Sequence, residues 1–194
     1  MKLSILIPSL PQRAHLLRRL IDVLQPQGVR FRNIYEPARG EVEAVVYVDS
    51  TTLISDKRNE LLKDAKGQYI AFVDDDDLVP EYYVSELLNA INEKPDCIGF
   101  RGYMTTNGNN RRNFIISNRY ANWHEANGEY LRTINHLSPV KRSIALKVMF
   151  PEKTRTGEDS IYSQMLKKHL KKEVFIDKDM YHYDFQTSIS SQCN

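Results

Sequence analysis

Apolar and polar residues alternate along the first half of the chain in a pattern that predicts strands and helices in turn. Short apolar runs rich in β-branched and aromatic residues have the composition of buried strands. They cover residues 3–7, 42–48, 68–73 and 97–104. Between these runs, apolar residues recur at helical spacing, first at Leu16, Leu17, Leu20, Ile21 and Leu24. The β-α-β-α-β order predicts an α/β fold with a mostly parallel sheet flanked by helices, in a single domain over residues 1–194.

Turn and capping residues set the expected ends of these elements. Ser9 is expected to cap the first helix, Ser55 or Asp56 the second, and Gly67 to close the second. The polar stretch 25–41 is longer than a usual helix–strand turn and predicts a loop that covers the site or binds a partner. The later elements are a hairpin turn at 107–110 before a strand at 112–117, a helix over 159–170 and a strand over 173–176.

Four consecutive aspartates, Asp74 to Asp77, follow the apolar run 69–73 directly. A strand that ends in carboxylates places them at the carboxyl edge of a sheet, where open α/β sheets hold ligands. Four like charges repel one another, and a divalent cation held together with phosphate oxygens offsets that cost. The run therefore predicts a metal–diphosphate site. The alternative is a solvated acidic turn before a helix, with Pro80 in the first turn of that helix.

Composition narrows the class of protein without identifying it. The chain has 194 residues, 41% hydrophobic and 27% charged, with a net charge of +2, as in an ordinary soluble domain. No apolar run approaches the ~18 residues of a membrane span. Cys97 and Cys193 lie too far apart for a metal or redox motif, so the cytoplasm is the expected compartment. The lysines of 167–172 and the pair Arg111–Arg112 are either solvated faces or a surface that tracks phosphates.

Glycine-rich phosphate-binding loops are missing from the sequence. Neither Gly-x-Gly-x-x-Gly nor the P-loop pattern occurs. A diphosphate bound by this chain therefore needs another counter-charge, which the aspartates and a metal ion would supply.

Four segments together resemble the family-2 glycosyltransferases of GT-A fold. They are LSILIPSLPQR from Leu3, VVYVDS ending at Ser50, KRNELLKDAKGQYIAFVDDDDLV from Lys57, and TGEDSIYSQML from Thr156. They match the family's first strand and loop, its second strand ending in an acid, its Asp-x-Asp segment and its Glu-Asp pair opening a helix. Compact proteins with the stretches NHLSPVKR and YHY, present here from Asn135 and from Tyr181, resemble those of tailed phages, which would place this one in a host cytoplasm.

The resemblance implies a donor site for a nucleotide-sugar, by family habit one carrying UDP. Asp49 would accept hydrogen bonds from the base, and Asp74 would face the ribose or the metal. Asp76 and His182 would ligate Mn²⁺ or Mg²⁺. His182 is otherwise a core or surface histidine. The remaining donor-binding residues implied are Pro8, Ser9, Arg13, Lys57, Arg58 and Asp75.

The resemblance implies that Asp159, beside Glu158, is the general base that takes a proton from the acceptor hydroxyl. A helix N-terminus favours an ionised carboxylate, which suits a base, although an ordinary N-terminal helix carboxylate would look the same. Trp123 and His136 are candidates for the acceptor side, and Trp123 is otherwise a core residue.

The sequence thus predicts a metal-dependent, inverting glycosyltransferase that adds one sugar to a hydroxyl acceptor, such as a modified DNA base or a glycan. The Gln-x-x-Arg-Trp stretch of processive members is missing, which argues against a polysaccharide synthase. Two alternatives remain. A nucleotidyltransferase would need a glycine-rich, basic first loop, which PSLPQR is not. A non-catalytic module that binds carbohydrate or nucleic acid would keep the fold without the chemistry.

Overall fold

The first half of the chain builds the parallel part of the sheet. The computed structural model describes residues 1–154 and 156–187. Its strand β1 (Leu3–Ser9) lies between β3 (Val42–Val48) and β4 (Tyr69–Phe72) and runs parallel to both. The edge strand β2 (Arg30–Asn33) pairs parallel with β3. Because Ser9 pairs with Val48 and Leu6 with Phe72, the carboxyl ends of these strands meet at one edge, as predicted.

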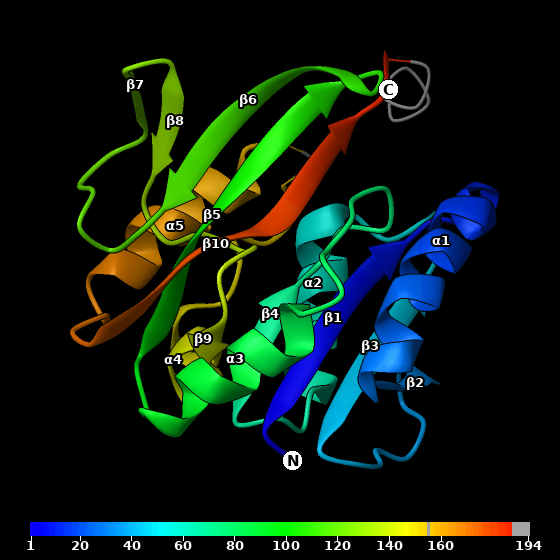
Figure 1. The fold of residues 1–194 in the computed structure, drawn as a ribbon. Helices are drawn as coiled ribbons and strands as arrows, with labels where there is room; N and C mark the ends of the chain where they lie inside the picture. Colours follow the sequence, from blue (N-terminus) through cyan, green and yellow to red (C-terminus); the bar gives the residue numbers. More distant parts are fainter. Residues whose placement is uncertain (155, 188–194) are drawn as a thin grey trace.

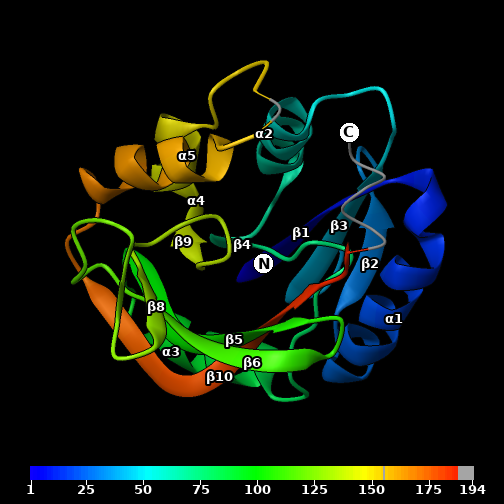
Figure 2. The ribbon, with the colours of Figure 1, turned by 90° about the horizontal axis from the view of Figure 1, so that it is seen from above.

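Helices cover both faces of this part of the sheet. On one face lie α1 (Ala14–Leu24) and α3 (Tyr83–Asn92); on the other lie α2 (Ile54–Asp64), α4 (Arg142–Val148) and α5 (Glu158–Lys167), as Figures 1 and 2 show. Two short 3-10 helices, η1 (Pro11–Arg13) and η2 (Gln25–Gln27), flank α1. Within the described residues, no helix is long and apolar enough to cross a membrane.

The second half of the sheet mixes parallel and antiparallel pairs, whereas β1 to β4 pair with one another in parallel, as predicted. β5 (Cys97–Thr106) and β6 (Asn109–Ile116) form an antiparallel hairpin, because Asn107 and Gly108 adopt the left-handed backbone that a tight turn needs. The long strand β10 (Glu173–Phe185) pairs parallel with β5. The short β9 (Val140–Lys141) joins β4 to β5, and β8 (Glu129–Arg132) and β7 (His124–Ala126) extend the sheet beyond β6. The α/β class is confirmed, with a mixed sheet.

Several expected caps are wrong because their side chains bond elsewhere. The N-cap residues of η1 and α2 are Leu10 and Leu53, and neither forms a side-chain cap. The side chains of Ser55 and Asp56 accept backbone N–H groups from the loop after α4. Gly67 lies beyond the end of α2, close to the backbone of β1. A Cβ there would come within 2.5 Å of the Ser4 backbone nitrogen, so only glycine allows this close approach.

A buried ion network holds β2 in place, inside the stretch 25–41 predicted to be a loop. The Arg32 guanidinium donates to Glu43, with Nε 2.6 Å from Oε2, and to Asp64. The Glu43 carboxylate also accepts the Ser4 hydroxyl at 2.6 Å and is fully buried. A charged residue at an inward position hides this strand from apolar patterning, because the pattern relies on hydrophobic side chains facing the core.

We expect Arg32→Met to lower the free energy of unfolding by about 3–5 kcal/mol, because it leaves the buried Glu43 carboxylate without its counter-ion. Denaturant unfolding at neutral pH measures this. Arg30→Met is the matched control, since Arg30 is exposed on the same strand and should change stability by less than about 0.5 kcal/mol. Equal stability of the two variants would contradict a structural role for the network.

Candidate functional site

A cavity of about 1030 Å³ opens at the carboxyl ends of β1 and β4. It brings together residues that are far apart in the sequence, from the first loop to the start of α5. Most of the predicted site residues line it; they are Pro8, Ser9, Arg13, Lys57, Arg58, Asp74, Asp75, Asp76, Trp123, His136, Glu158 and Asp159. Asp49 and His182 are not among the lining residues. The structure therefore brings the predicted site residues together in one cavity, except for these two.

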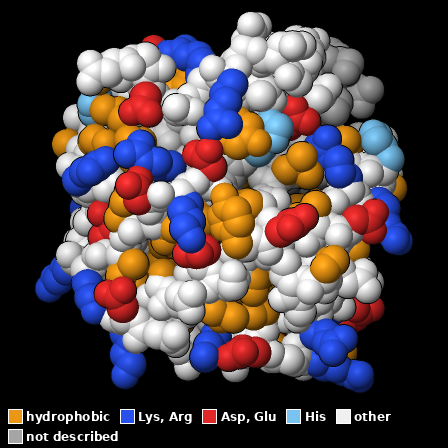
Figure 3. Space-filling view, in the orientation of Figure 1, with side chains coloured by type: hydrophobic (Ala, Val, Ile, Leu, Met, Phe, Trp, Pro, Cys, Tyr) orange, Lys and Arg blue, Asp and Glu red, His pale blue; other side chains and the backbone are white. Residues whose placement is uncertain are grey.

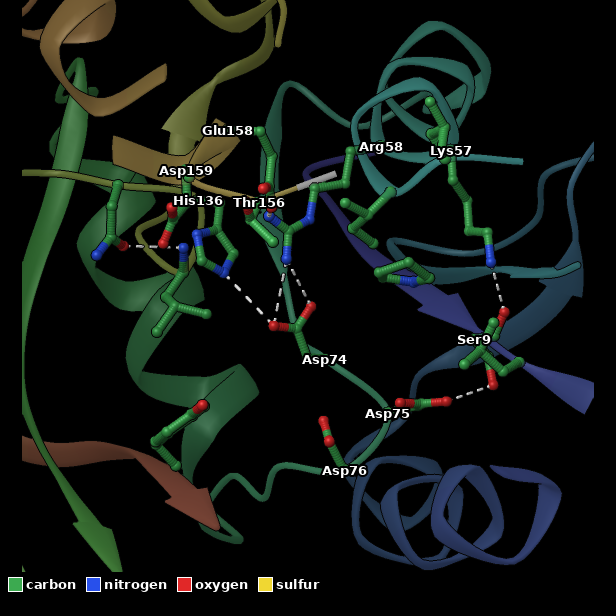
Figure 4. A pocket seen from close by; sticks show the side chains of 18 of the residues that line it. Ser9, Lys57, Arg58, Asp74, Asp75, Asp76, His136, Thr156, Glu158 and Asp159 are labelled. Atoms are coloured by element: carbon green, nitrogen blue, oxygen red, sulfur yellow. Dashed lines mark hydrogen bonds and ion pairs between the residues drawn. The ribbon is translucent and has the colours of Figure 1, made fainter. Parts of the chain in front are cut away.

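Arg58 ties the end of β4 to the start of α5. Its guanidinium is buried and donates to Asp74, 3.1 Å from Oδ1, and to Glu158 Oε1 at 2.6 Å. His136 Nε2 lies 3.5 Å from the other Asp74 oxygen, and Figure 4 shows the Asp74 carboxylate between His136 and Arg58. Burial works against ionisation here, but the charges and hydrogen bonds of Arg58 and His136 together outweigh it and hold the pKa of Asp74 well below its usual value. Asp74 is thus an ionised, firmly oriented carboxylate.

The next two aspartates face the first loop of the sheet. The Ser9 hydroxyl donates to Asp75 at 2.6 Å, and Arg13 Nη1 lies 3.1 Å from Asp75 and 3.0 Å from Asp76. Burial raises the pKa of Asp75. Burial, together with the charge of Asp74, raises the pKa of Asp76 to about 6. One guanidinium shared by two carboxylates leaves negative charge at Asp76 only partly compensated.

The fourth aspartate has a structural role. Asp77 is buried outside the cavity lining, where it accepts the Tyr181 hydroxyl at 2.7 Å and the Asp184 backbone N–H at 3.0 Å. Burial and the neighbouring aspartates raise the pKa of Asp77 well above its usual value. The Tyr181 hydroxyl also accepts the Asp74 backbone N–H at 3.2 Å. These bonds fasten the aspartate segment to β10, so Asp77 orders the site from behind.

The Lys57 ammonium joins the ends of two strands. It is buried and donates to the backbone carbonyl oxygens of Ser9, at 2.8 Å, and of Asp49. The Asp49 carboxylate accepts the backbone N–H groups of Thr51 and Thr52. The side chain of Thr52, followed by its backbone N–H, lowers the pKa of Asp49 to about 2. Asp49 and Lys57 therefore shape the loop 50–53, which lines the cavity.

The start of α5 places two acids with different surroundings. Gly157 adopts a left-handed backbone, with φ of 77°, immediately before the helix, which favours glycine at that position. Glu158 is buried and paired with Arg58. Asp159 lines the cavity, and its Oδ1 accepts the backbone N–H of Ser160 at 2.7 Å. Of the two predicted catalytic acids, Asp159 thus has the environment of a group that can take a proton, and Glu158 that of a positioning group.

The predicted metal ligand His182 lies away from the cavity lining. Its Nε2 is 2.7 Å from the Thr105 hydroxyl, and its ring stacks on Tyr103 with centroids 4.4 Å apart. The neighbouring Tyr183 lines the cavity instead, because successive residues of a strand point to opposite faces. Period-two alternation along 181–183 was the signal that could have pointed to Tyr183.

An aromatic group contributes another part of the wall. Trp123, Tyr130 and Arg132 line it, and Tyr130 and Arg132 were not predicted from the sequence. The Arg132 guanidinium lies 5.1 Å from the Trp123 ring centroid and 4.7 Å from that of Tyr130. Tyr130 and Arg132 lie on β8, and the segment 123–132 that contains β7 and β8 is short and polar, without a clear periodic pattern.

Several residues of the two basic clusters make contacts within the protein. Lys167 and Lys172 donate to the backbone carbonyls of Asn118 and Glu93, Arg111 pairs with Asp179 and Arg112 with Glu125. Lys167 ends α5, about 12 Å along the helix from Asp159. On the face that Figure 3 shows, basic and acidic side chains are interspersed.

Among the residues that the structure describes, no three His, Cys, Asp or Glu side chains are arranged as a ready-made metal centre. The donor set nevertheless suits a hard divalent cation. Asp76 is a cavity carboxylate whose pKa is raised by burial and by the charge of Asp74, and a cation beside it would favour its ionised form. The residues fit an ion held by one or two carboxylates together with phosphate oxygens, as Mg²⁺ is often held.

Comparison with known proteins identifies the family to which this fold and site correspond. A sequence model of glycosyl transferase family 2 matches residues 42–149, more than half of the chain. The match runs from β3 through the aspartate run to the end of α4 and stops before Asp159.

One curated relative is the minor teichoic acid biosynthesis protein GgaB of Bacillus subtilis (strain 168). It is 28% identical over 144 residues, which cover 71% of this chain and 16% of GgaB. The chain thus spans about a sixth of the length of this relative.

Solved structures share the fold at low sequence identity. S. aureus TarS 1-349 superposes with a TM-score of 0.70 at 18% identity, covering 95% of this chain and 60% of that one. Its complex with UDP gives a TM-score of 0.70 at 18% identity, over 100% of this chain and 63% of TarS, and its complex with UDP-GlcNAc 0.69 at 17%, over 95% and 58%. A197 from STIV gives 0.51 at 16% identity, over 91% of this chain and 82% of A197. These likenesses confirm the GT-A type of α/β fold.

Proposed function

The chain belongs to glycosyl transferase family 2, and from that premise we propose that it transfers one sugar from a nucleotide-sugar donor to a hydroxyl group of an acceptor. The observation that carries this proposal is the cavity in which Asp74, Asp75 and Asp76 face the first loop while Asp159 lies in the same lining. TarS, a protein of similar fold, has been crystallised with UDP and with UDP-GlcNAc, which supports UDP as the nucleotide.

The donor occupies the part of the cavity formed by the loops after β1, β3 and β4. Ser9 and Pro8 lie at one side of it and the loop 50–53 at the other. The Lys57 ammonium donates to the backbone carbonyls of Ser9 and Asp49, so it positions this subsite by joining the two strand ends rather than by contacting the ligand. Asp49 acts through the loop that its carboxylate orders.

Asp76, with Asp74 beside it, would hold a divalent Mn²⁺ or Mg²⁺ ion together with the donor diphosphate. When bound, such an ion supplies positive charge to the diphosphate as it leaves. Arg13 is the chain's own cation at this place, since it lies within 3.1 Å of both Asp75 and Asp76. His182 does not support this assignment, because its Nε2 is engaged with Thr105.

Asp159 acts as the general base of a single displacement. The acceptor hydroxyl gives its proton to the Asp159 carboxylate, its oxygen forms the new bond to the anomeric carbon, and the bond from that carbon to the diphosphate breaks. Attack opposite the leaving group inverts the anomeric configuration. Glu158, neutralised by Arg58, fixes the start of α5 and so the place of Asp159.

We expect Mn²⁺ to raise the affinity for UDP-GlcNAc at least about 10-fold, and Asp76→Asn to abolish that gain, because the ion joins the carboxylate to the diphosphate. Isothermal titration with Mn²⁺ and with EDTA measures both. Asp177→Asn, which removes an exposed carboxylate on β10, is the control and should keep the gain. Equal affinity with and without the metal in the wild type would refute the metal role.

Replacing Asp159 by Asn should leave UDP-GlcNAc affinity unchanged and slow sugar transfer by about 10²–10⁴-fold, because the amide cannot take the proton. The amide oxygen can still accept the Ser160 N–H, so the start of α5 is preserved. Release of UDP in the presence of an acceptor is the readout. Asp22→Asn on the exposed face of α1 is the control, and undiminished turnover of Asp159→Asn would remove Asp159 from the base role.

A further inference from the structure

One part of the cavity wall comes from elements that do not contribute to the donor loops. Its residues are Phe114 and Ile116 of β6, Trp123 before β7, and Tyr130 and Arg132 of β8, hereafter the β8 subsite. The subsite combines flat aromatic rings, an aliphatic side chain and one guanidinium. Such a surface suits an organic ligand with one anionic group.

Arg132 differs from the neighbouring arginines in its ion pairing. In the part of the chain that the structure describes, no carboxylate lies within ion-pair distance of it; its Nη1 donates to the carbonyl oxygens of His124, at 3.2 Å, and Leu131, at 3.3 Å. The arginines of the neighbouring strands β5 and β6 each form an ion pair: Arg101 with Asp177, Arg111 with Asp179, and Arg112 with Glu125. Of these four arginines, Arg132 lines the cavity.

The Arg132 side chain is ordered before any ligand arrives. Its guanidinium lies over the rings of Trp123 and Tyr130, and the Tyr130 hydroxyl accepts Arg112, which is in turn held by Glu125 at 2.9 Å. Preordering of this kind reduces the entropy lost on binding. Trp123 adds an indole N–H that is shielded from solvent and has no hydrogen-bond partner among the described residues. The subsite thus offers one cationic donor group on a rigid support.

Burial destabilises the charged form of the Arg132 guanidinium and so lowers its pKa. A bound anion would stabilise the charged guanidinium. Phosphate suits this role, because its oxygens match the planar, forked donors of a guanidinium. One such cation suits one phosphate group. A nucleic-acid duplex would need a row of unpaired cations, whereas the neighbouring arginines are already engaged and Lys167 and Lys172 bond to backbone carbonyls.

We propose that the β8 subsite binds the phosphate of a phosphorylated sugar or polyol acceptor, and that Arg132 selects this acceptor over an uncharged one. The proposal rests on the proposed function in that the bound molecule offers its hydroxyl to the transfer reaction at Asp159. Arg132 is a specificity residue and takes no part in moving the proton.

The test measures binding separately from turnover. Glycerol 3-phosphate and its uncharged counterpart glycerol are titrated into UDP-bound protein, residues 1–194, at low and fixed ionic strength. We expect the wild type to bind glycerol 3-phosphate at least about 10-fold more tightly than glycerol, and Arg132→Gln to lose about 10-fold of that affinity. Arg119→Gln is the matched control: Arg119 is exposed, has no carboxylate partner among the described residues and stacks on Tyr120 outside the cavity lining.

Each outcome decides one claim. Equal wild-type affinities for glycerol 3-phosphate and glycerol overturn the proposal without any variant, so the test survives a variant that fails to fold. Equal losses in Arg132→Gln and Arg119→Gln, or displacement of glycerol 3-phosphate by a short DNA duplex, also overturn it. Normal UDP-GlcNAc binding with no phosphate preference refutes the subsite and leaves the transfer proposal intact. Arg132-dependent phosphate binding without any UDP-GlcNAc binding refutes the transfer proposal and leaves the subsite.

Discussion

Carboxylates concentrated at the end of β4 impose a charge balance on which the arrangement of the site depends. Asp74 is held ionised between Arg58 and His136, and Arg13 is shared by Asp75 and Asp76. The partners come from the first loop, from α2 and from the segment before β9, so each neutralising contact also joins two distant parts of the chain. The balance is incomplete at Asp76, whose pKa is raised to about 6 by burial and by the charge of Asp74.

The same contacts fix the geometry between the donor and acceptor sides. Arg58 is buried near the rings of Phe72 and Phe150 and reaches both Asp74 and Glu158, so the position of Asp159 follows from the position of the aspartate run. Tyr181, on β10, holds the run from behind through Asp77 and the Asp74 backbone. We therefore expect a change at Arg58 to disturb both the proposed metal position and the proposed base position, because this buried arginine contacts both Asp74 and Glu158.

Features that depend on local sequence patterns could be predicted from the sequence, whereas features that depend on tertiary contacts could not. The carboxyl edge of the parallel strands and the aspartate run were predictable, since apolar runs and the residues after them define both. His182 was placed by analogy, and strand alternation turns Tyr183 into the cavity instead. The strand at Arg32 was missed because its inward side chain is charged and paired only in three dimensions. The contact of Asp49 with the base stays a prediction; in the structure its oxygens accept hydrogen bonds from the loop that follows it.

The aspartate run thus has two parts: Asp74, Asp75 and Asp76 face the cavity, and Asp77 fastens it to the fold. Anomalous diffraction at the manganese edge, from crystals grown with Mn²⁺ and UDP, tests this division directly. We predict one manganese peak at coordination distance from an Asp76 oxygen and from the UDP diphosphate, with Arg13 displaced from at least one of its two carboxylates. UDP bound in the cavity with Arg13 still bridging Asp75 and Asp76, and with no manganese beside them, would contradict the account.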